Sequence, residues 1–184
     1  MKGFWFLCLI LGCIVALSSG PARSATLGFE PSLQAVSPGE DISVGLVISG
    51  LGDYSAPSLG AFDITVGFDP SLLSFSDYTL GPYLGDLSLG EAMDVSSGQV
   101  SADSVNLVEL SFLDVASLEA LQPSSFTIAT LTFEGLQAGN ASFHFSINAI
   151  GDEYGNPLPE PRTVLLLSLA LVGIAAFRKR HIRV

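Results

Sequence analysis

GAFDITVGFDPSLL, residues 60–73, is the stretch that decides the fold of this 184-residue chain. Its first part alternates apolar side chains (Phe62, Ile64, Val66) with small or polar ones, and this period of two is typical of a β-strand with one buried face. The Asp69-Pro70 pair that follows favours a turn, because proline fixes φ and the aspartate side chain can bond the backbone ahead of it. The stretch therefore predicts a strand, a turn and the start of a second strand.

The same alternation recurs along the chain over residues 42–48, 129–133 and 141–149, and Gly-, Pro- and Asn-rich turns separate the runs. Only residues 117–121 have a helical pattern. Many short strands with one polar face predict an all-β sandwich of two sheets. The side chains expected between the sheets are Phe62, Phe68, Leu131, Phe133, Phe143 and Phe145, whereas His144 is expected to face solvent.

These segments resemble cohesin domains. Ser37-Pro38-Gly39-Glu40 before residues 42–48 resembles the entry to their second strand, and residues 60–73 resemble their central strand with its aromatic-Asp-Pro turn. Residues 128–133 and the strand after Gly139 resemble their late strands. The resemblance spans most of residues 26–150 and implies a jelly-roll β-sandwich of about nine strands that serves as a binding or scaffolding module. Residues 77–113 match less well, and no dockerin-contacting residue is identifiable.

The first 25 residues have the pattern of a secretory signal peptide. Lys2 precedes an apolar stretch, residues 4–17, and small residues continue to Ala25. Ile10-Leu11-Gly12-Cys13 loosely matches a lipoprotein cleavage motif, although Leu11 is bulky for it. Both cysteines of the chain lie in this segment, so the exported domain must be stabilised by an apolar core rather than by disulfides.

The C-terminus has three successive parts. A Pro-rich linker, residues 151–161, ends in Pro159-Glu160-Pro161, and an apolar run of fifteen residues, 163–177, leads to Arg178-Lys179-Arg180. Residues 162–184 are predicted to form a transmembrane helix whose basic tail stops it on the cytoplasmic side. The run is short for a hydrocarbon core of about 30 Å, so Arg162 and the tail would have to reach the two interfaces.

This ordered tail resembles the PEP-CTERM sorting signal of bacteria, with Pro159, Glu160 and Pro161 as its motif and Arg178, Lys179 and Arg180 as its membrane stop. The resemblance implies a Gram-negative source that makes exopolysaccharide and an exosortase that processes the tail. We therefore expect an exported protein, anchored in the inner membrane before sorting and then displayed on the cell surface or in the extracellular matrix.

Charge is distributed very unevenly. Residues 26–158 contain seventeen of the eighteen acids and neither lysine nor arginine, which gives a formal charge of −17. Such a domain would be repelled by the phosphates of nucleic acids, so nucleic-acid binding is excluded. The acids keep the exported domain soluble, bind divalent cations diffusely, or keep displayed copies apart by repulsion.

The domain offers little catalytic chemistry. Its single histidine, His144, and its lack of cysteine leave no Ser-His-Asp triad and no His/Cys metal cluster, so no catalytic residue, protein-ligated metal or cofactor is predicted. The adjacent pairs Glu40-Asp41 and Asp152-Glu153 are turn residues, although paired carboxylates could support glycoside hydrolysis. Calcium is the one candidate ion, because oxygen ligands suffice for it. Its candidate ligands are Asp152, Glu153 and Asn156.

Three alternative functions are compatible with these observations. The first is a non-catalytic, cohesin-like binding or scaffold module that binds a protein partner in the matrix. The second is a carbohydrate-binding module that stacks polysaccharide on loop tyrosines. The third is a secreted glycoside hydrolase. The tyrosines are either sugar platforms or lids over the core edge, and they are Tyr54, Tyr78, Tyr83 and Tyr154.

Overall fold

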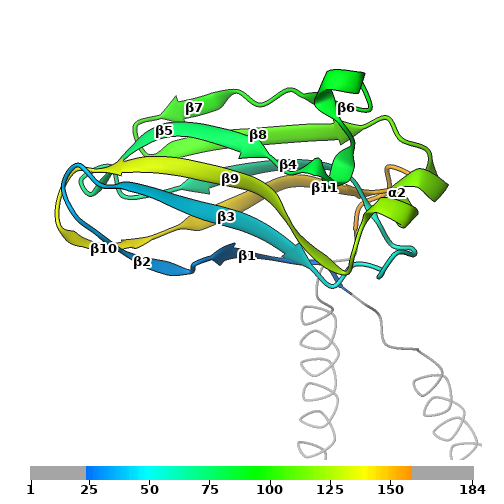
Figure 1. The fold of residues 1–184 in the computed structure, drawn as a ribbon, viewed down its shortest axis with the longest axis horizontal. Coiled ribbons are helices and arrows are strands. Elements are labelled where there is room, and N and C mark those ends of the chain that lie inside the picture. The colour runs from blue at the N-terminus through cyan, green and yellow to red at the C-terminus, as the bar shows by residue number, and fades with distance from the viewer. Residues whose placement is uncertain (1–23, 159–184) are drawn as a thin grey trace, which may run out of the picture.

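The computed structural model describes residues 24–158, which form two antiparallel β-sheets packed face to face (Figure 1). The strands are β1 (Thr26–Glu30), β2 (Leu33–Val36), β3 (Asp41–Ser49), β4 (Leu59–Gly67), β5 (Leu73–Leu80), β6 (Ala92–Asp94), β7 (Gly98–Ser101), β8 (Ser104–Ser111), β9 (Ser125–Gly135), β10 (Gly139–Ser142) and β11 (His144–Asp152). The helical elements are η1 (Pro82–Leu84), η2 (Leu87–Leu89) and α2 (Val115–Leu121).

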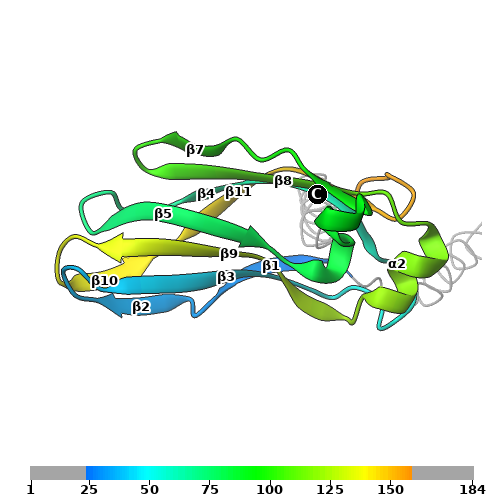
Figure 2. The same ribbon diagram turned by 45° about the horizontal axis from the view of Figure 1, so that its top comes forward.

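One sheet has the strand order β1-β3-β9-β5 and is named here the β3–β9 sheet. The other has the order β11-β4-β8-β6, with β7 also paired to β8, and is named the β4–β8 sheet. β2 pairs separately with β10. Figure 2 shows β5, the last strand of the β3–β9 sheet, between β9 and the hairpin of β7 and β8. Two sheets with one buried face each confirm the predicted sandwich.

The core follows from the alternation of the central strands. Phe62, Phe68, Leu131 and Phe133 are buried as predicted, and the Phe133 ring lies 4.9 Å from that of Phe68. Phe143 and Phe145 are only partly buried and pack against the edge of the core. Both lie beside Phe29 of β1, with ring centroids 5.6 and 5.7 Å apart. Aromatic pairs at these separations add to the stabilisation from burial.

Two details differ from the sequence expectation. The strand expected over residues 141–149 is divided at Phe143 into β10, which pairs with β2, and β11, which pairs with β4, so the sandwich has eleven strands rather than about nine. A bulge between Ile147 and Ala149 then interrupts the ladder of β11 with β4. Ile147 is 46% exposed at this edge strand, and the next inward contact is made by Ile150. A bulge adds one residue and so breaks the period of two.

The helix expected over residues 117–121 lies within α2, which begins two residues earlier at Val115. Its N-cap is Asp114, whose Oδ1 accepts the Ser117 N–H at 2.8 Å. The chain leaves α2 at Gln122, a buried residue whose side chain joins three elements. Its Oε1 accepts the Leu59 N–H at 2.7 Å, and its Nε2 donates to the carbonyls of Leu59 and Tyr83 at 2.8 and 2.9 Å. Gln122 therefore connects α2 to β4 and η1.

Several sequence predictions fall outside the described residues. They concern the signal peptide up to residue 23, the motif Pro159, Glu160 and Pro161, the apolar run, and the membrane stop Arg178, Lys179 and Arg180. Between residues 24 and 158, no helix has the length and apolar character needed to cross a membrane.

Candidate functional site

The solvent-facing side of the β4–β8 sheet, named here the outer face, combines a polar end with an apolar end. The ladder register places Thr65 of β4 beside Asn106 of β8 and Ser146 of β11. Further along, Ala61 of β4 lies beside Leu110 of β8, which in turn lies beside Met93 of β6. Because cross-strand neighbours point to the same side of a sheet, these residues form continuous rows over several strands.

Asp63 organises the polar end. Its Oδ1 accepts hydrogen bonds from Nδ2 of Asn106 and from Nδ2 of Asn148, both at 2.8 Å. Asn148 also donates to the Thr65 hydroxyl at 3.1 Å. These amides come from the strands on either side of β4, so one carboxylate fixes side chains from β4, β8 and β11. Within residues 24–158, Asp63 Oδ2 accepts no hydrogen bond and could accept one from a partner.

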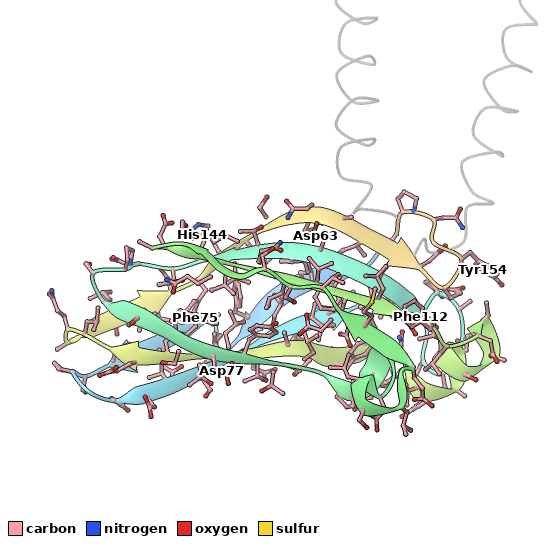
Figure 3. All side chains as sticks on the ribbon, turned by 90° about the horizontal axis from the view of Figure 1, so that it is seen from above. Asp63, Phe75, Asp77, Phe112, His144 and Tyr154 are labelled. Carbon is pink, nitrogen blue, oxygen red and sulfur yellow. The ribbon has the colours of Figure 1, made fainter. Side chains whose placement is uncertain are left out.

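His144 lies on the outer side of β11 and is exposed, as the sequence predicted. Figure 3 labels it on the same side of the sandwich as Asp63. The imidazole ring covers Gly67, the residue opposite it on β4, and a Cβ at position 67 would clash with that ring. Glycine at this position therefore lets the imidazole ring approach the backbone of β4.

The apolar end is formed by β6 and the end of β8. Met93 is 42% exposed and Phe112, just beyond β8, is 61% exposed. Val95 is also exposed, and its N–H donates to the Val108 carbonyl at 3.0 Å. Large apolar side chains gathered in this way on one side of a protein are characteristic of interaction sites.

The outward side of the β3–β9 sheet differs in kind. Its rows combine hydroxyl residues, glycine and acids: Ser43 pairs with Thr132, Gly45 with Thr130 and Asp41 with Glu134. None of the large apolar residues that are exposed within residues 24–158 belongs to β3, β5 or β9. Because exposed large apolar residues lie on the outer face of the β4–β8 sheet and not on these three strands, we take the outer face as the candidate binding surface.

The carboxylate pairs considered for catalysis or calcium hold turns together. Oδ1 of Asp152 accepts the backbone N–H of Tyr154 at 2.9 Å and of Asn156 at 2.8 Å. Oε2 of Glu153 accepts the Ser58 N–H at 2.7 Å, and Oε2 of Glu40 accepts a backbone N–H within its own turn. No group of three or more His, Cys, Asp or Glu side chains is placed to hold a metal in the described part of the chain. In the loop of Asp152, Glu153 and Asn156, one oxygen of each carboxylate is thus already engaged by backbone N–H groups.

The four tyrosines divide into two pairs. Tyr83 stacks on Phe126 at 4.6 Å between ring centroids, and Tyr78 packs against the core while its hydroxyl donates to Asp94 at 2.8 Å. Burial and this hydrogen bond raise the pKa of Tyr78. These two residues are lids, as one of the sequence interpretations expected. Tyr54 and Tyr154 are exposed loop residues.

The sequence interpretation missed the apolar end of the outer face. Met93, Val95 and Phe112 lie within residues 77–113, the segment that resembled cohesins least. A usable signal was present, because Met93 and Val95 flank Asp94 with a period of two, but three residues are too few to identify a strand.

Comparison with known proteins gives a fold and no sequence family. The sequence matches no family model and no curated protein. Among solved structures, a type II cohesin–X-dockerin complex from Acetivibrio cellulolyticus aligns with a TM-score of 0.55, at 16% identity over 75% of this chain and 92% of that chain. The sixth cohesin of scaffoldin B from the same organism, in complex with a Cel5 dockerin mutant, aligns with a TM-score of 0.52, at 17% identity over 73% and 92% of the two chains.

A third match is the solution structure of a cohesin from Clostridium acetobutylicum, with a TM-score of 0.53 and 16% identity over 74% of this chain and 84% of that one. The fold is that of cohesin domains. The cohesin-like domain accounts for nearly all of the described residues, and the resemblance inferred from residues 60–73 is confirmed at the level of the fold.

Proposed function

We propose that the domain is a non-catalytic module that binds a protein partner through the outer face of the β4–β8 sheet. The observation that supports this proposal is the composition of that face, on which exposed apolar residues around Met93 adjoin the hydrogen-bonded row around Asp63. Protein interfaces combine an apolar centre with a polar rim in this way.

The charge of the domain defines the chemistry of the partner. Residues 26–158 contain no lysine or arginine and seventeen acids, so every lysine or arginine in the interface must come from the partner. Oδ2 of Asp63 is the acceptor on the face for such a group. A partner with basic residues around an apolar centre would be both steered toward the domain and fixed in register on it.

The solved structures with this fold support the choice of a protein ligand. Two of the three described above are complexes of a cohesin with a dockerin-containing chain. At 16–17% identity the partner itself does not transfer to this domain. We propose only that the partner is a protein and that it uses this face.

Met93→Asp should weaken partner binding tenfold or more, because it places a charge at the apolar centre of the face. The matched control is Leu136→Asp, since Leu136 is 46% exposed in the turn after β9 and gains the same single charge far from β6. Full-length variants are immobilised and exposed to the secreted proteins of the source organism and to purified dockerin modules. A specific ligand is one that the wild type and the control retain and Met93→Asp does not.

The same immobilised variants, exposed to soluble and insoluble polysaccharides, test the carbohydrate-binding alternative. Retention of polysaccharide that is unaffected by Met93→Asp but lost in Tyr54→Ala or Tyr154→Ala would replace the protein-binding proposal with a carbohydrate-binding one. Equal retention of every protein by Met93→Asp and Leu136→Asp would remove the outer face as the binding site. Turnover of a glycan substrate would indicate the secreted hydrolase.

We further propose that the tail delivers this module to the cell surface or the extracellular matrix by exosortase-dependent sorting from the inner membrane. The support is the ordered sequence of Pro159-Glu160-Pro161, the apolar run and Arg178-Lys179-Arg180. Glu160→Ala, or removal of Arg178-Lys179-Arg180, is expected to leave the unprocessed protein in the inner-membrane fraction. Glu134→Ala, on exposed β9 surface, is the control and should be displayed normally. Normal display of the Glu160→Ala protein would contradict exosortase sorting.

A further inference from the structure

One carboxyl group in the core has no partner. Glu109 is an inward-facing residue of β8 between the two sheets, with 0% of its surface exposed. Neither Oε1 nor Oε2 makes a hydrogen bond to any of the described residues. Buried polar groups without partners are rare in folded proteins, and a buried charge without a partner is rarer still. Glu109 is therefore an acid that this core accommodates in its neutral form.

The second carboxyl in this region is Asp94, directly opposite Glu109 in the ladder of β6 and β8. Unlike Glu109, it has partners: its Oδ2 accepts the Tyr78 hydroxyl at 2.8 Å and its Oδ1 accepts the Ser96 N–H at 2.9 Å. Burial opposes ionisation of Asp94, but these hydrogen bonds outweigh it and lower the pKa. Asp94 is consequently ionised in the folded domain, beside the uncharged Glu109.

The remaining elements packed on this region bring few titratable groups. β5 contributes Tyr78 and, one residue earlier, Asp77, which Figure 3 places on the opposite side of the sandwich from Asp63. η1 contributes Tyr83, which stacks on Phe126. η2, beside β6, is flanked by Asp86 and Glu91, and both carboxylates accept backbone N–H groups of the η2 turn. β4 places Phe62 opposite Glu109. No positive side chain comes from any of these elements, because residues 26–158 contain neither lysine nor arginine. Burial and the charge of Asp94 raise the pKa of Glu109 to about 8.

The edge above Glu109 is a short strand, and the backbone hydrogen bonds of Val95 to Val108 and of Phe112 to Glu91 extend its pairing with β8 by one residue at each end. β6 has three residues and pairs only with β8. The Tyr78–Asp94 bond is the one side-chain hydrogen bond between β5 and β6 in the described structure. Short edge strands with few buried contacts are the parts of a protein that open locally before it unfolds.

We propose that Glu109 is a proton-controlled latch for β6: as the neutral acid it lets β6 close over the sandwich, and on ionisation it releases β6 and the residues that β6 presents on the outer face. The physical reason is that a second negative charge, buried and facing Asp94, is relieved only when the edge opens and water reaches the carboxylate. Met93 and Val95 move with this edge, so the effect on a partner rests on the proposed function, whereas the latch itself does not.

The pH window follows from the two protonation equilibria. Opening exposes Glu109 to water, where its pKa returns to the ordinary value of about 4.5, whereas in the closed state it is about 8. Below pH 4.5 both states hold the proton and the latch is fully closed. Between these two values the closed state binds one proton more than the open state, so the closed-to-open ratio falls about tenfold per pH unit. Above pH 8 both states have lost the proton and the ratio no longer changes through this group.

Hydrogen exchange of the full-length chain between pH 6 and pH 8 tests the latch without any partner. After correction for the intrinsic exchange rate, amides of residues 92–95 should lose protection about tenfold per pH unit. Glu109→Gln, which stays neutral at every pH, should keep that protection constant. The control Glu134→Gln removes an exposed carboxyl from β9 and should follow the wild type. Equal pH dependence in Glu109→Gln and the wild type would overturn the latch.

A second measurement does not depend on the variant. A ¹³C titration of the glutamate carboxyls in the wild-type chain should show one that titrates near pH 8, and only ordinary values near 4.5 would overturn the proposal. Once a partner is known, its affinity should weaken between pH 6 and 8 for the wild type but not for Glu109→Gln. If exchange shows the latch but the partner is insensitive to Met93→Asp, the latch stands and the binding face is wrong.

Discussion

Phe133→Ala is expected to lower the free energy of unfolding by about 3–5 kcal/mol, one of the two largest losses that a single substitution should cause in this domain. Phe133 is fully buried in the central strand β9. Its ring contacts those of Phe68, Phe75 and Phe143, with centroids 4.9, 5.8 and 5.2 Å away. Alanine leaves a cavity that neighbours on both sheets cannot fill without losing contacts of their own.

Thr132→Ala is the matched control, because Thr132 precedes Phe133 on the same strand and points to the opposite side of the sheet. Urea unfolding of the full-length variants, followed by tyrosine fluorescence, gives both free energies. The Thr132 variant should differ from the wild type by about 0.5 kcal/mol or less. Losses of similar size at the two positions would mean that the register of β9 is wrong.

The sequence predicted this part of the fold because burial there follows a period of two. Ile64 and Val66 of β4 and Leu131 and Phe133 of β9 alternate with small or polar residues in the sequence and are buried in the structure. The rule fails at Asn148, where the bulge adds a residue to β11, and at Phe143, where the chain passes from one strand partner to another. Both are decided by pairing between distant segments, which a local pattern does not contain.

Glu109 shows a different limit. Val105, Leu107 and Glu109 occur at a period of two and all point inward. From the sequence alone, however, a glutamate at the third position would be assigned to the polar, exposed end of the strand. The outer face was hidden for a related reason. Asp63, Asn106 and Asn148 are far apart in the sequence and meet only because β4 lies between β8 and β11. The sequence could thus predict which residues form the core better than which polar residues come together.

The acidic domain replaces ion pairs with hydrogen bonds to its own backbone. Asp86 accepts the Ser88 N–H and Asp114 the Ser117 N–H, and in each case hydrogen bonds from that serine lower the pKa of the carboxyl. Turn and cap carboxylates of this kind need no cation, so seventeen acids are compatible with a folded domain that has no lysine or arginine. The surface therefore remains complementary to a basic partner.

Gln122→Ala is expected to cost about 3–4 kcal/mol, because it removes three hydrogen bonds and leaves buried backbone groups of another element without partners. The Gln122 side chain is 1% exposed and satisfies both the N–H and the carbonyl of Leu59, at the start of β4, as well as the carbonyl of Tyr83 in η1. Leu59 is itself fully buried, so water cannot replace the amide without opening the end of the sandwich.

Two further variants separate the hydrogen bonds from the packing. Gln122→Leu retains most of the side-chain volume but none of the hydrogen bonds, so it should be destabilised nearly as much as Gln122→Ala. Gln99→Ala removes an exposed glutamine from β7 and should leave the unfolding curve unchanged within about 0.5 kcal/mol. If Gln122→Leu were as stable as the wild type, the site would need only volume, and the connection between α2, β4 and η1 would be apolar packing rather than a hydrogen-bonded junction.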